Sequence, residues 1–419
     1  MTSTMPPPAL TFKPRNPVTL EDARLNQNML VDLMMKLTLL DGVTTLGRLA
    51  HQMKVSMQIM DQLFRYFRTQ QLCEVKGMVG NDYEFALSAA GRKLAQDRYA
   101  ISQYIGAAPV KLDDYCHAVR EQAARHPITR STLQEVFFDL VLPDVILDQL
   151  GPAVISGTTI FLYGPTGNGK TSIAERLVRI YKDYVYIPYA IEVEGQIVNI
   201  FDSVVHQALD TQEDDIDPRW VLCRRPCIAV GGELVPEMLE LRFDETLGFY
   251  SAPLQMKANN GLFIIDDFGR QMINPRDLLN RWIVPLDRRI DFLSLRTGVK
   301  FPIPFETLVV FSTNLDPRQL ADEAFLRRIQ NKIKVDTITP EVFDRILERV
   351  CGDYEIPFDP EAAAHLRQNC SPDGKGVLRA CYPRDMVKIL LSIADYEQRG
   401  PELSKRDLDR ALGLYFAKG

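Results

Sequence analysis

A glycine-rich segment near the middle of the chain constrains its fold more than any other. Residues 161–173 read FLYGPTGNGKTSI, where an apolar run leads into a loop and then into a helix-like pattern, SIAERLVRIYKDY. This order of strand, loop and helix is what the pattern G-x-x-x-x-G-K-[ST] requires. Glycine permits positive φ and carries no Cβ, so backbone N–H groups of the loop can turn inward around a phosphate. The segment therefore predicts a site for a nucleoside triphosphate.

The residue types in this loop predict distinct contacts with the nucleotide. Lys170 can reach the β- and γ-phosphates, and the hydroxyl of Thr171 can ligate Mg²⁺. The predicted nucleotide-binding residues are Gly164, Pro165, Thr166, Gly167, Asn168, Gly169, Lys170, Thr171 and Ser172.

Two further apolar runs end in polar side chains that a phosphate site needs. Residues 262–267 read LFIIDD, and residues 308–313 read LVVFST before Asn314. A carboxylate at the carboxyl end of a buried parallel strand is placed to hold Mg²⁺ beside a phosphate loop. We expect Asp266 to hold the metal, Asp267 to polarise the attacking water, and the Asn314 amide to orient that water.

Taken in order, these residues resemble the AAA+ ATPase superfamily from about residue 140 to the C-terminus. The matching features are Walker A at 164–171, Walker B at 262–267, sensor 1 at Asn314, an arginine finger at Arg327 or Arg328, and sensor 2 at Arg384. The resemblance implies a mixed α/β fold: a three-layer αβα P-loop domain with a parallel sheet, followed by a helical lid.

The resemblance also implies a mechanism. ATP and Mg²⁺ would be the cofactors, Thr171 and Asp266 would ligate the metal, and an arginine from a neighbouring subunit would complete the site. Arg328 is favoured over Arg327 because residues 326–329 resemble the Leu-x-Arg-Phe of MoxR-type sequences. The expected assembly is a homo-oligomer, a hexameric ring. The catalytic candidates are Lys170, Asp267, Asn314, Arg327, Arg328 and Arg384.

Two sequence features narrow the resemblance. A predicted β-hairpin at 289–305 is similar to the pre-sensor-1 hairpin of MoxR-type ATPases and magnesium chelatases, and Arg296 and Lys300 at its tip are either partner contacts or solvated turn residues. Residues 231–253 lack the GAFTGA sequence of sigma-54 activators, which argues against that function. Most relatives carry Glu where this chain has Asp267, which puts the speed of turnover in question.

The patterns divide the chain into five expected units. Residues 1–25 are proline-rich and expected to be a flexible arm, 26–100 resemble a winged-helix domain, 101–137 a helical linker, 138–336 the ATPase core and 337–419 the lid. In the winged-helix-like unit we expect three helices, strands at 72–75 and 83–87, and a closing helix from Ser88.

Three stretches around the loop carry further expectations. Residues 140–150, LVLPDVILDQL, lead into the loop strand and form either part of an adenine pocket or plain core. Residues 184–187 and 191–200 are expected to be single strands.

The charge of the chain bears on whether its partner is a protein or DNA. The net charge is −6, and residues 1–100 carry 12 Lys and Arg against 9 Asp and Glu, less basic than a DNA-reading surface usually is. The leading hypothesis is an ATPase that remodels a protein partner. The alternatives are a DNA-directed motor or regulator, and a nucleotide-gated scaffold in which Asp267 makes hydrolysis very slow.

Localisation follows from what the sequence lacks. The N-terminus has no signal-peptide pattern, no apolar run approaches the ~18 residues of a membrane span, and seven scattered cysteines do not suggest a disulfide framework. We expect a cytoplasmic protein without a membrane span.

Overall fold

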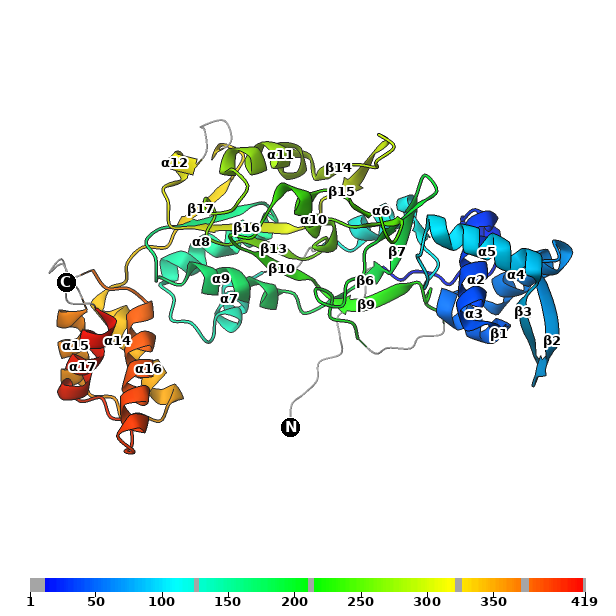
Figure 1. The fold of residues 1–419 in the computed structure, drawn as a ribbon. Helices are drawn as coiled ribbons and strands as arrows, with labels where there is room; N and C mark the ends of the chain where they lie inside the picture. Colours follow the sequence, from blue (N-terminus) through cyan, green and yellow to red (C-terminus); the bar gives the residue numbers. More distant parts are fainter. Residues whose placement is uncertain (1–11, 124–127, 210–214, 321–325, 371–376, 417–419) are drawn as a thin grey trace.

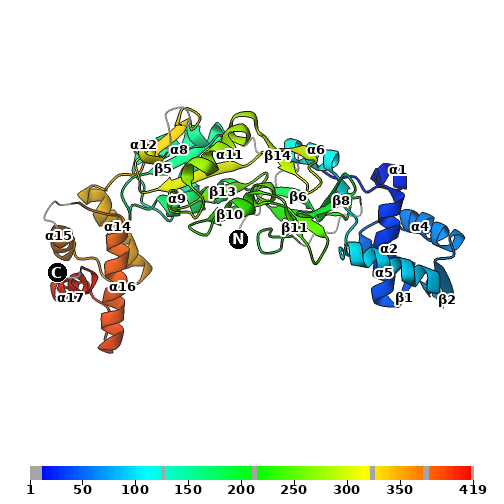
Figure 2. The same ribbon diagram turned by 45° about the horizontal axis from the view of Figure 1, so that its top comes forward.

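The computed structural model describes residues 12–123, 128–209, 215–320, 326–370 and 377–416. It is elongated (Figure 1), with a small N-terminal domain at one end, an α/β body in the middle and a helical bundle at the other end. A second view shows the same order of the three parts (Figure 2).

The body is built on a five-stranded parallel sheet. Its order is β10-β13-β16-β5-β17, with β10 at Cys227–Val230, β13 at Leu262–Ile265, β16 at Leu308–Thr313, β5 at Ile160–Tyr163 and β17 at Asn331–Lys334. Every residue of β13 and β16 is buried, as expected for parallel strands covered on both faces.

Helices cover both faces of this sheet. On one face Ile160 and Leu162 pack with α7 (Arg130–Val136), α8 (Asp144–Ile155), α9 (Lys170–Arg176) and the 3-10 helix η1 (Leu177–Ile180). On the other face Phe161 packs with α11 (Pro275–Arg288), whose Trp282 is fully buried. The predicted three-layer α/β P-loop domain with a parallel sheet is therefore confirmed.

A second β-rich layer is formed mostly by the long stretch between β5 and β13, with one strand, β4, from before β5. It contains the antiparallel pair β6-β9 and a sheet of order β11-β12-β8-β7-β4. The bounds are β4 Val110–Lys111, β6 Tyr184–Pro188, β7 Ala190–Val193, β8 Gln196–Asn199, β9 Trp220–Arg224, η2 Pro236–Leu239, β11 Arg242–Asp244, β12 Phe249–Ser251 and α10 Leu254–Lys257. Helix α6 (Leu112–Glu121) packs on this layer through Tyr115 and Val119.

Two local predictions in this region are wrong. Residues 191–200 form a hairpin of β7 and β8 rather than one strand, because Glu194 and Gly195 adopt φ of 48° and 77° and reverse the chain. The helix after the loop is also shorter than its pattern suggests: α9 ends at Arg176, and η1 continues it as a 3-10 helix.

The N-terminal domain has one buried core, and the expected three helices, two strands and closing helix occur in that order. This domain also contains a four-residue helix and a three-residue strand. Its elements are α1 Leu20–Ala23, α2 Gln27–Asp41, β1 Val43–Thr45, α3 Leu46–Met53, α4 Met57–Thr69, β2 Cys73–Val79, β3 Asp82–Leu87 and α5 Ala89–Ile101. The sheet order is β1-β3-β2, which leaves β2 at an edge. Its assignment to the winged-helix class stays a prediction.

This domain contacts the β-rich layer directly. Gln103, just after α5, donates its backbone N–H to Leu247 O at 2.7 Å and its side-chain amide to Thr246 O at 3.0 Å. Of the arm expected at 1–25, residues 1–11 lie outside the described residues, while Phe12 packs on Trp220 with ring centroids 5.7 Å apart.

The hairpin predicted at 289–305 is present as β14 (Ile290–Ser294) paired with β15 (Lys300–Pro304). Residues beyond β17 form the helical bundle: α14 Pro340–Asp353, α15 Pro360–Asn369, α16 Cys381–Tyr396 and α17 Lys405–Tyr415. A short helix, α12 (Pro317–Leu320), follows β16.

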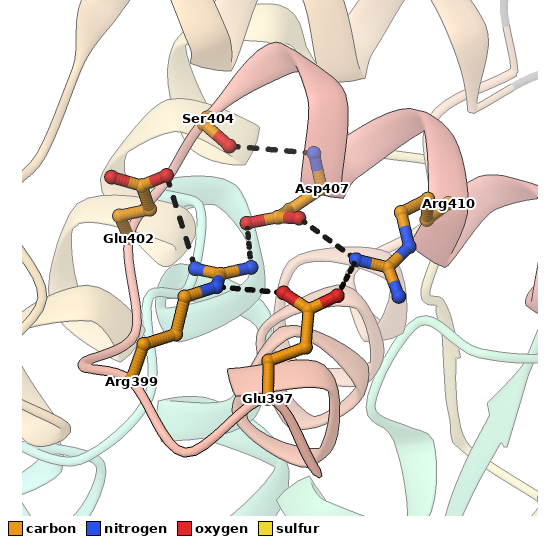
Figure 3. A network of polar contacts seen from close by, with 6 residues as sticks. All are labelled: Glu397, Arg399, Glu402, Ser404, Asp407 and Arg410. Atoms are coloured by element: carbon orange, nitrogen blue, oxygen red, sulfur yellow. Dashed lines mark hydrogen bonds and ion pairs between the residues drawn. The ribbon is translucent and has the colours of Figure 1, made fainter. Parts of the chain in front are cut away.

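A polar network joins the end of α16 to α17 in this bundle (Figure 3). Asp407 is only 2% exposed and accepts hydrogen bonds from Arg399 and Arg410, and Glu397 also pairs with both arginines. Ser404 caps α17 by accepting from the Asp407 backbone N–H at 3.3 Å.

Candidate nucleotide site

The glycine-rich loop lies at the carboxyl end of β5. Gly164, Gly167 and Gly169 have φ of 135°, 82° and 86°, values that residues with a Cβ rarely adopt. A Cβ on Gly164 would lie 2.3 Å from Val335 O, so the loop can pass this close to the chain after β17 only with glycine there.

Lys170 is held against the loop. It is 8% exposed, and its ammonium donates to Gly164 O and Pro165 O, each at 2.9 Å. Burial lowers the pKa of Lys170, and the nearby carboxylates of Asp266 and Asp267 oppose that shift. A phosphate entering the loop would bring negative charge beside an ammonium that protein carbonyls only partly satisfy.

Thr171 and Asp266 are in contact although they are far apart in the sequence. The Thr171 hydroxyl donates to the Asp266 carboxylate, with Oγ1 lying 2.8 Å from Oδ2 and 3.0 Å from Oδ1. A hydroxyl and a carboxylate beside a phosphate loop are the hard oxygen ligands that Mg²⁺ prefers, with phosphate and water completing its shell. These two residues fit the metal expected there.

A cavity of about 640 Å³ opens beside the loop. It is lined by loop residues 166–172, Asp267, residues 139–143, Val145 and Ile146 before and within α8, and, from the bundle, Ile338, Ile346, Val350 and Arg384 among others. The apolar stretch at 140–146 therefore borders the loop, where a base would lie if the loop held phosphates.

The start of α16 docks on the loop, which the sequence analysis did not anticipate. Cys381 donates its backbone N–H to Gly167 O at 2.8 Å, and Ala380 N lies 3.2 Å from Asn168 Oδ1. Arg379 Nη1 is 3.4 Å from Thr166 Oγ1. No spacing rule connects these residues, which are more than two hundred positions apart; only the neighbouring Arg384 pointed to this helix.

The remaining predicted residues lie at two different edges of the sheet. Asn314 follows β16 directly, so it is at the same carboxyl edge as the loop and Asp266, although it is not among the residues that line the cavity. Arg327 and Arg328 instead border a separate cavity with Thr158 and Thr159, the residues that precede β5. The two arginines are thus at the amino edge, on the far side of the sheet from the loop.

Arg328 has a partner in its own chain. Its Nε donates to Asp287 Oδ2, at the end of α11, at 2.8 Å. Of the hairpin residues, Arg296 pairs with Glu245 at 2.7 Å and lies 4.8 Å above the Phe243 ring, while its side chain stays 56% exposed. Lys300 is exposed at the start of β15.

Comparison with known proteins gives a partial match. Residues 339–413 match the model of a family described as a domain of unknown function (DUF8689). A search of curated proteins finds no match.

Two solved structures illustrate the structural matches. NtrX from Brucella abortus is 16% identical over 79% of this chain and 67% of that chain, with a TM-score of 0.40. A RuvB variant from Thermotoga maritima is 14% identical over 67% of this chain and 72% of that chain, with a TM-score of 0.38.

The described ranges contain neither a membrane-spanning helix nor a cluster of metal-ligating side chains. No helix in them is long and apolar enough to cross a membrane. No group of three or more His, Cys, Asp or Glu side chains that could hold a metal ion occurs in the same ranges.

Proposed function

We propose that this protein is an oligomeric AAA+ ATPase that couples ATP hydrolysis to the remodelling of a protein partner. The observation that carries the proposal is the contact of Thr171 with Asp266 beside Lys170, at the rim of a cavity that is apolar on one side. The Thr171–Asp266 pair suits a metal ion, Lys170 suits the phosphates, and the apolar side of the cavity suits the nucleotide base.

In the proposed reaction a water attacks the γ-phosphate in line with the leaving oxygen. Lys170 would bind the β- and γ-phosphates, and Thr171 and Asp266 would hold Mg²⁺, which when bound would supply positive charge to the phosphate oxygens. Asp267, exposed at the cavity, accepts a hydrogen bond from the attacking water, and Asn314 orients that water.

The position of Arg327 and Arg328 supports their action on a neighbouring subunit. They precede β17, whereas the loop follows β5, and strands of four residues separate the two edges by roughly 13 Å at 3.3 Å per residue. An arginine at the amino edge is better placed to meet the site of a second copy. We keep Arg328 as the finger, which would have to leave Asp287 when it engages.

The bundle and the N-terminal domain supply the proposed output. Arg384 borders the cavity from α16, where it would contact the γ-phosphate. Loss of that phosphate would remove one contact between the bundle and the loop. The N-terminal domain, at the opposite end of the molecule (Figure 1), is the proposed site for the protein partner.

Mixing two inactive variants tests this proposal. Lys170→Ala should abolish ATP binding, and Arg328→Ala should keep binding but lose hydrolysis. Because each variant retains the residue that the other lacks, a mixture should regain part of the wild-type rate at interfaces that pair an intact loop with an intact Arg328. Phosphate release at a series of mixing ratios measures this.

Two results would contradict the proposal. Wild-type protein that neither binds nor hydrolyses ATP would remove the ATPase assignment itself. Full hydrolysis by a monomeric Arg328→Ala protein would falsify the finger assignment alone.

A further inference from the structure

The backbone at Asp267 is left-handed. Its φ is 47°, in a turn that directly follows β13. For residues other than glycine this conformation is uncommon, and Asp and Asn tolerate it best because their short polar side chains can bond locally. A left-handed residue also directs its Cβ differently from one that continues a strand, so this turn determines where the Asp267 carboxylate points.

Gln271 brackets this turn with both ends of its side-chain amide. Its Oε1 accepts from the Gly269 backbone N–H at 2.8 Å, and its Nε2 donates to Asp266 O at 2.8 Å. Asp267 therefore lies inside a loop closed by one side chain. Removing the amide would leave the Gly269 N–H and the Asp266 carbonyl without these partners.

Thr313 joins the same turn to β16. Its hydroxyl donates to Phe268 O at 2.6 Å and accepts from the Leu315 N–H at 3.1 Å, and Thr313 is fully buried. Phe268 also donates its backbone N–H to Ser312 O at 2.7 Å. The residue after Thr313 is Asn314, so one hydroxyl connects the carboxylate turn to the segment that carries the predicted water-orienting amide.

Close packing leaves this turn little freedom. Gly269 has φ of 103°, and a Cβ there would lie 2.6 Å from Leu320 Cδ2 and 3.0 Å from Leu315 Cδ1. The turn that contains Asp267 thus packs directly against the segment that follows Asn314. A shift of either segment would move the other.

We propose that Gln271 and Thr313 are positioning residues for hydrolysis, and that they hold the turn in the left-handed form that suits Asp rather than Glu at position 267. They touch neither substrate nor metal; they act by fixing the direction of the Asp267 carboxylate relative to Asn314. This inference rests on the proposed ATPase function.

Two matched pairs of variants test the positioning role. Thr313→Ser keeps the hydroxyl and Thr313→Val removes it with little change of shape. Gln271→Ala removes the side-chain amide that bonds both Gly269 and Asp266. Gln319→Ala is its control, because Gln319 is exposed on the neighbouring α12. We expect Thr313→Val and Gln271→Ala to lower kcat roughly tenfold or more, since small displacements of reacting groups are costly. KM should change much less than kcat, because Lys170 and the glycine loop hold the phosphates, and Gln271 bonds the backbone carbonyl of Asp266 rather than the carboxylate that would hold Mg²⁺.

Hydrogen exchange of a peptide spanning residues 266–271 gives a readout independent of activity. Exchange should rise in Thr313→Val and Gln271→Ala and stay at the wild-type rate in Thr313→Ser and Gln319→Ala. Equal kcat within either pair, or faster exchange without a fall in kcat, would overturn the positioning role. Wild-type protein without turnover would count against the ATPase proposal. The hydrogen-exchange rates of residues 266–271 would still show whether Gln271 and Thr313 hold the turn.

Asp267→Glu tests the part of the inference that concerns residue 267. The longer Glu side chain is less suited to left-handed backbone. It also moves the carboxylate away from the position that the turn, held by Gln271 and Thr313, gives it. Turnover should therefore fall. Turnover above the wild-type rate would overturn this part of the inference and favour a slow, nucleotide-gated scaffold.

Discussion

At the residue scale, Lys36 of α2 shows what burial does to a charge. It is 4% exposed, and its ammonium donates to Ser102 O at 3.1 Å. Burial lowers the pKa of Lys36 to about 8, and the charge of Asp32 opposes the shift only in part. Between pH 8 and the usual lysine pKa of about 10.5 the unfolded chain binds more protons than the folded chain, so raising the pH across this window should stabilise the fold.

We predict that Lys36→Met removes this pH dependence. At pH 7 the variant should be more stable than wild type by on the order of 2 kcal/mol, because the cost of a buried ammonium is gone. The advantage should shrink as pH rises from 8 to 10. Thermal unfolding of both proteins over this range measures it, and a constant difference would contradict the assignment.

At the element scale, the junction of α16 and α17 depends on a buried carboxylate (Figure 3). Arg399 pairs both with Asp407, whose side chain is 3% exposed, and with Glu402, whose side chain is 65% exposed. The two acids share an arginine and differ in burial. Only the buried one should matter, since exposed pairs contribute little.

We predict that Asp407→Ala lowers the local unfolding free energy of the bundle by about 2 kcal/mol, because Arg399 and Arg410 lose the acceptor that this buried carboxylate provides. Glu402→Ala should cost less than about 0.5 kcal/mol. Native-state hydrogen exchange of α16 and α17 amides measures both. Equal effects of the two variants would show that burial does not decide the contribution.

At the scale of the whole molecule, the turn between β11 and β12 joins the N-terminal domain to the body. Gly248 has φ of 68°, and a Cβ there would lie 2.2 Å from Ile101 O. The same turn contacts the β14-β15 hairpin, since Glu245 pairs with Arg296. A continuous set of contacts therefore runs from the body to the N-terminal domain.

We predict that Gly248→Ala releases this docking. Gly298→Ala is the matched control, because Gly298 also has positive φ, 85°, but no atom lies within 4 Å of its Cβ position. Both variants carry backbone strain of about 1 kcal/mol; only Gly248→Ala adds a clash. Exchange of the Gln103 amide should rise in that variant alone, and a similar rise in both would argue that the turn does not hold the domain.

The sequence alone determined the features that lie within short segments. The glycine loop, the apolar strands before Asp266 and Asn314, and the hairpin at 289–305 are each set by local residue types and spacing, and strand pairing confirms the parallel sheet. Local backbone preferences act over a few residues, so a pattern can reveal them. The assignment of site residues to catalytic roles stays a prediction.

Tertiary structure decided what depends on contacts between distant residues. The docking of Cys381 on Gly167 and the separation of Arg328 from the loop have no local signature. The left-handed backbone at Asp267 is also of this kind, because its turn is bonded at Phe268 O to Thr313 on another strand. Packing between elements, rather than the preference of any one segment, determines these arrangements.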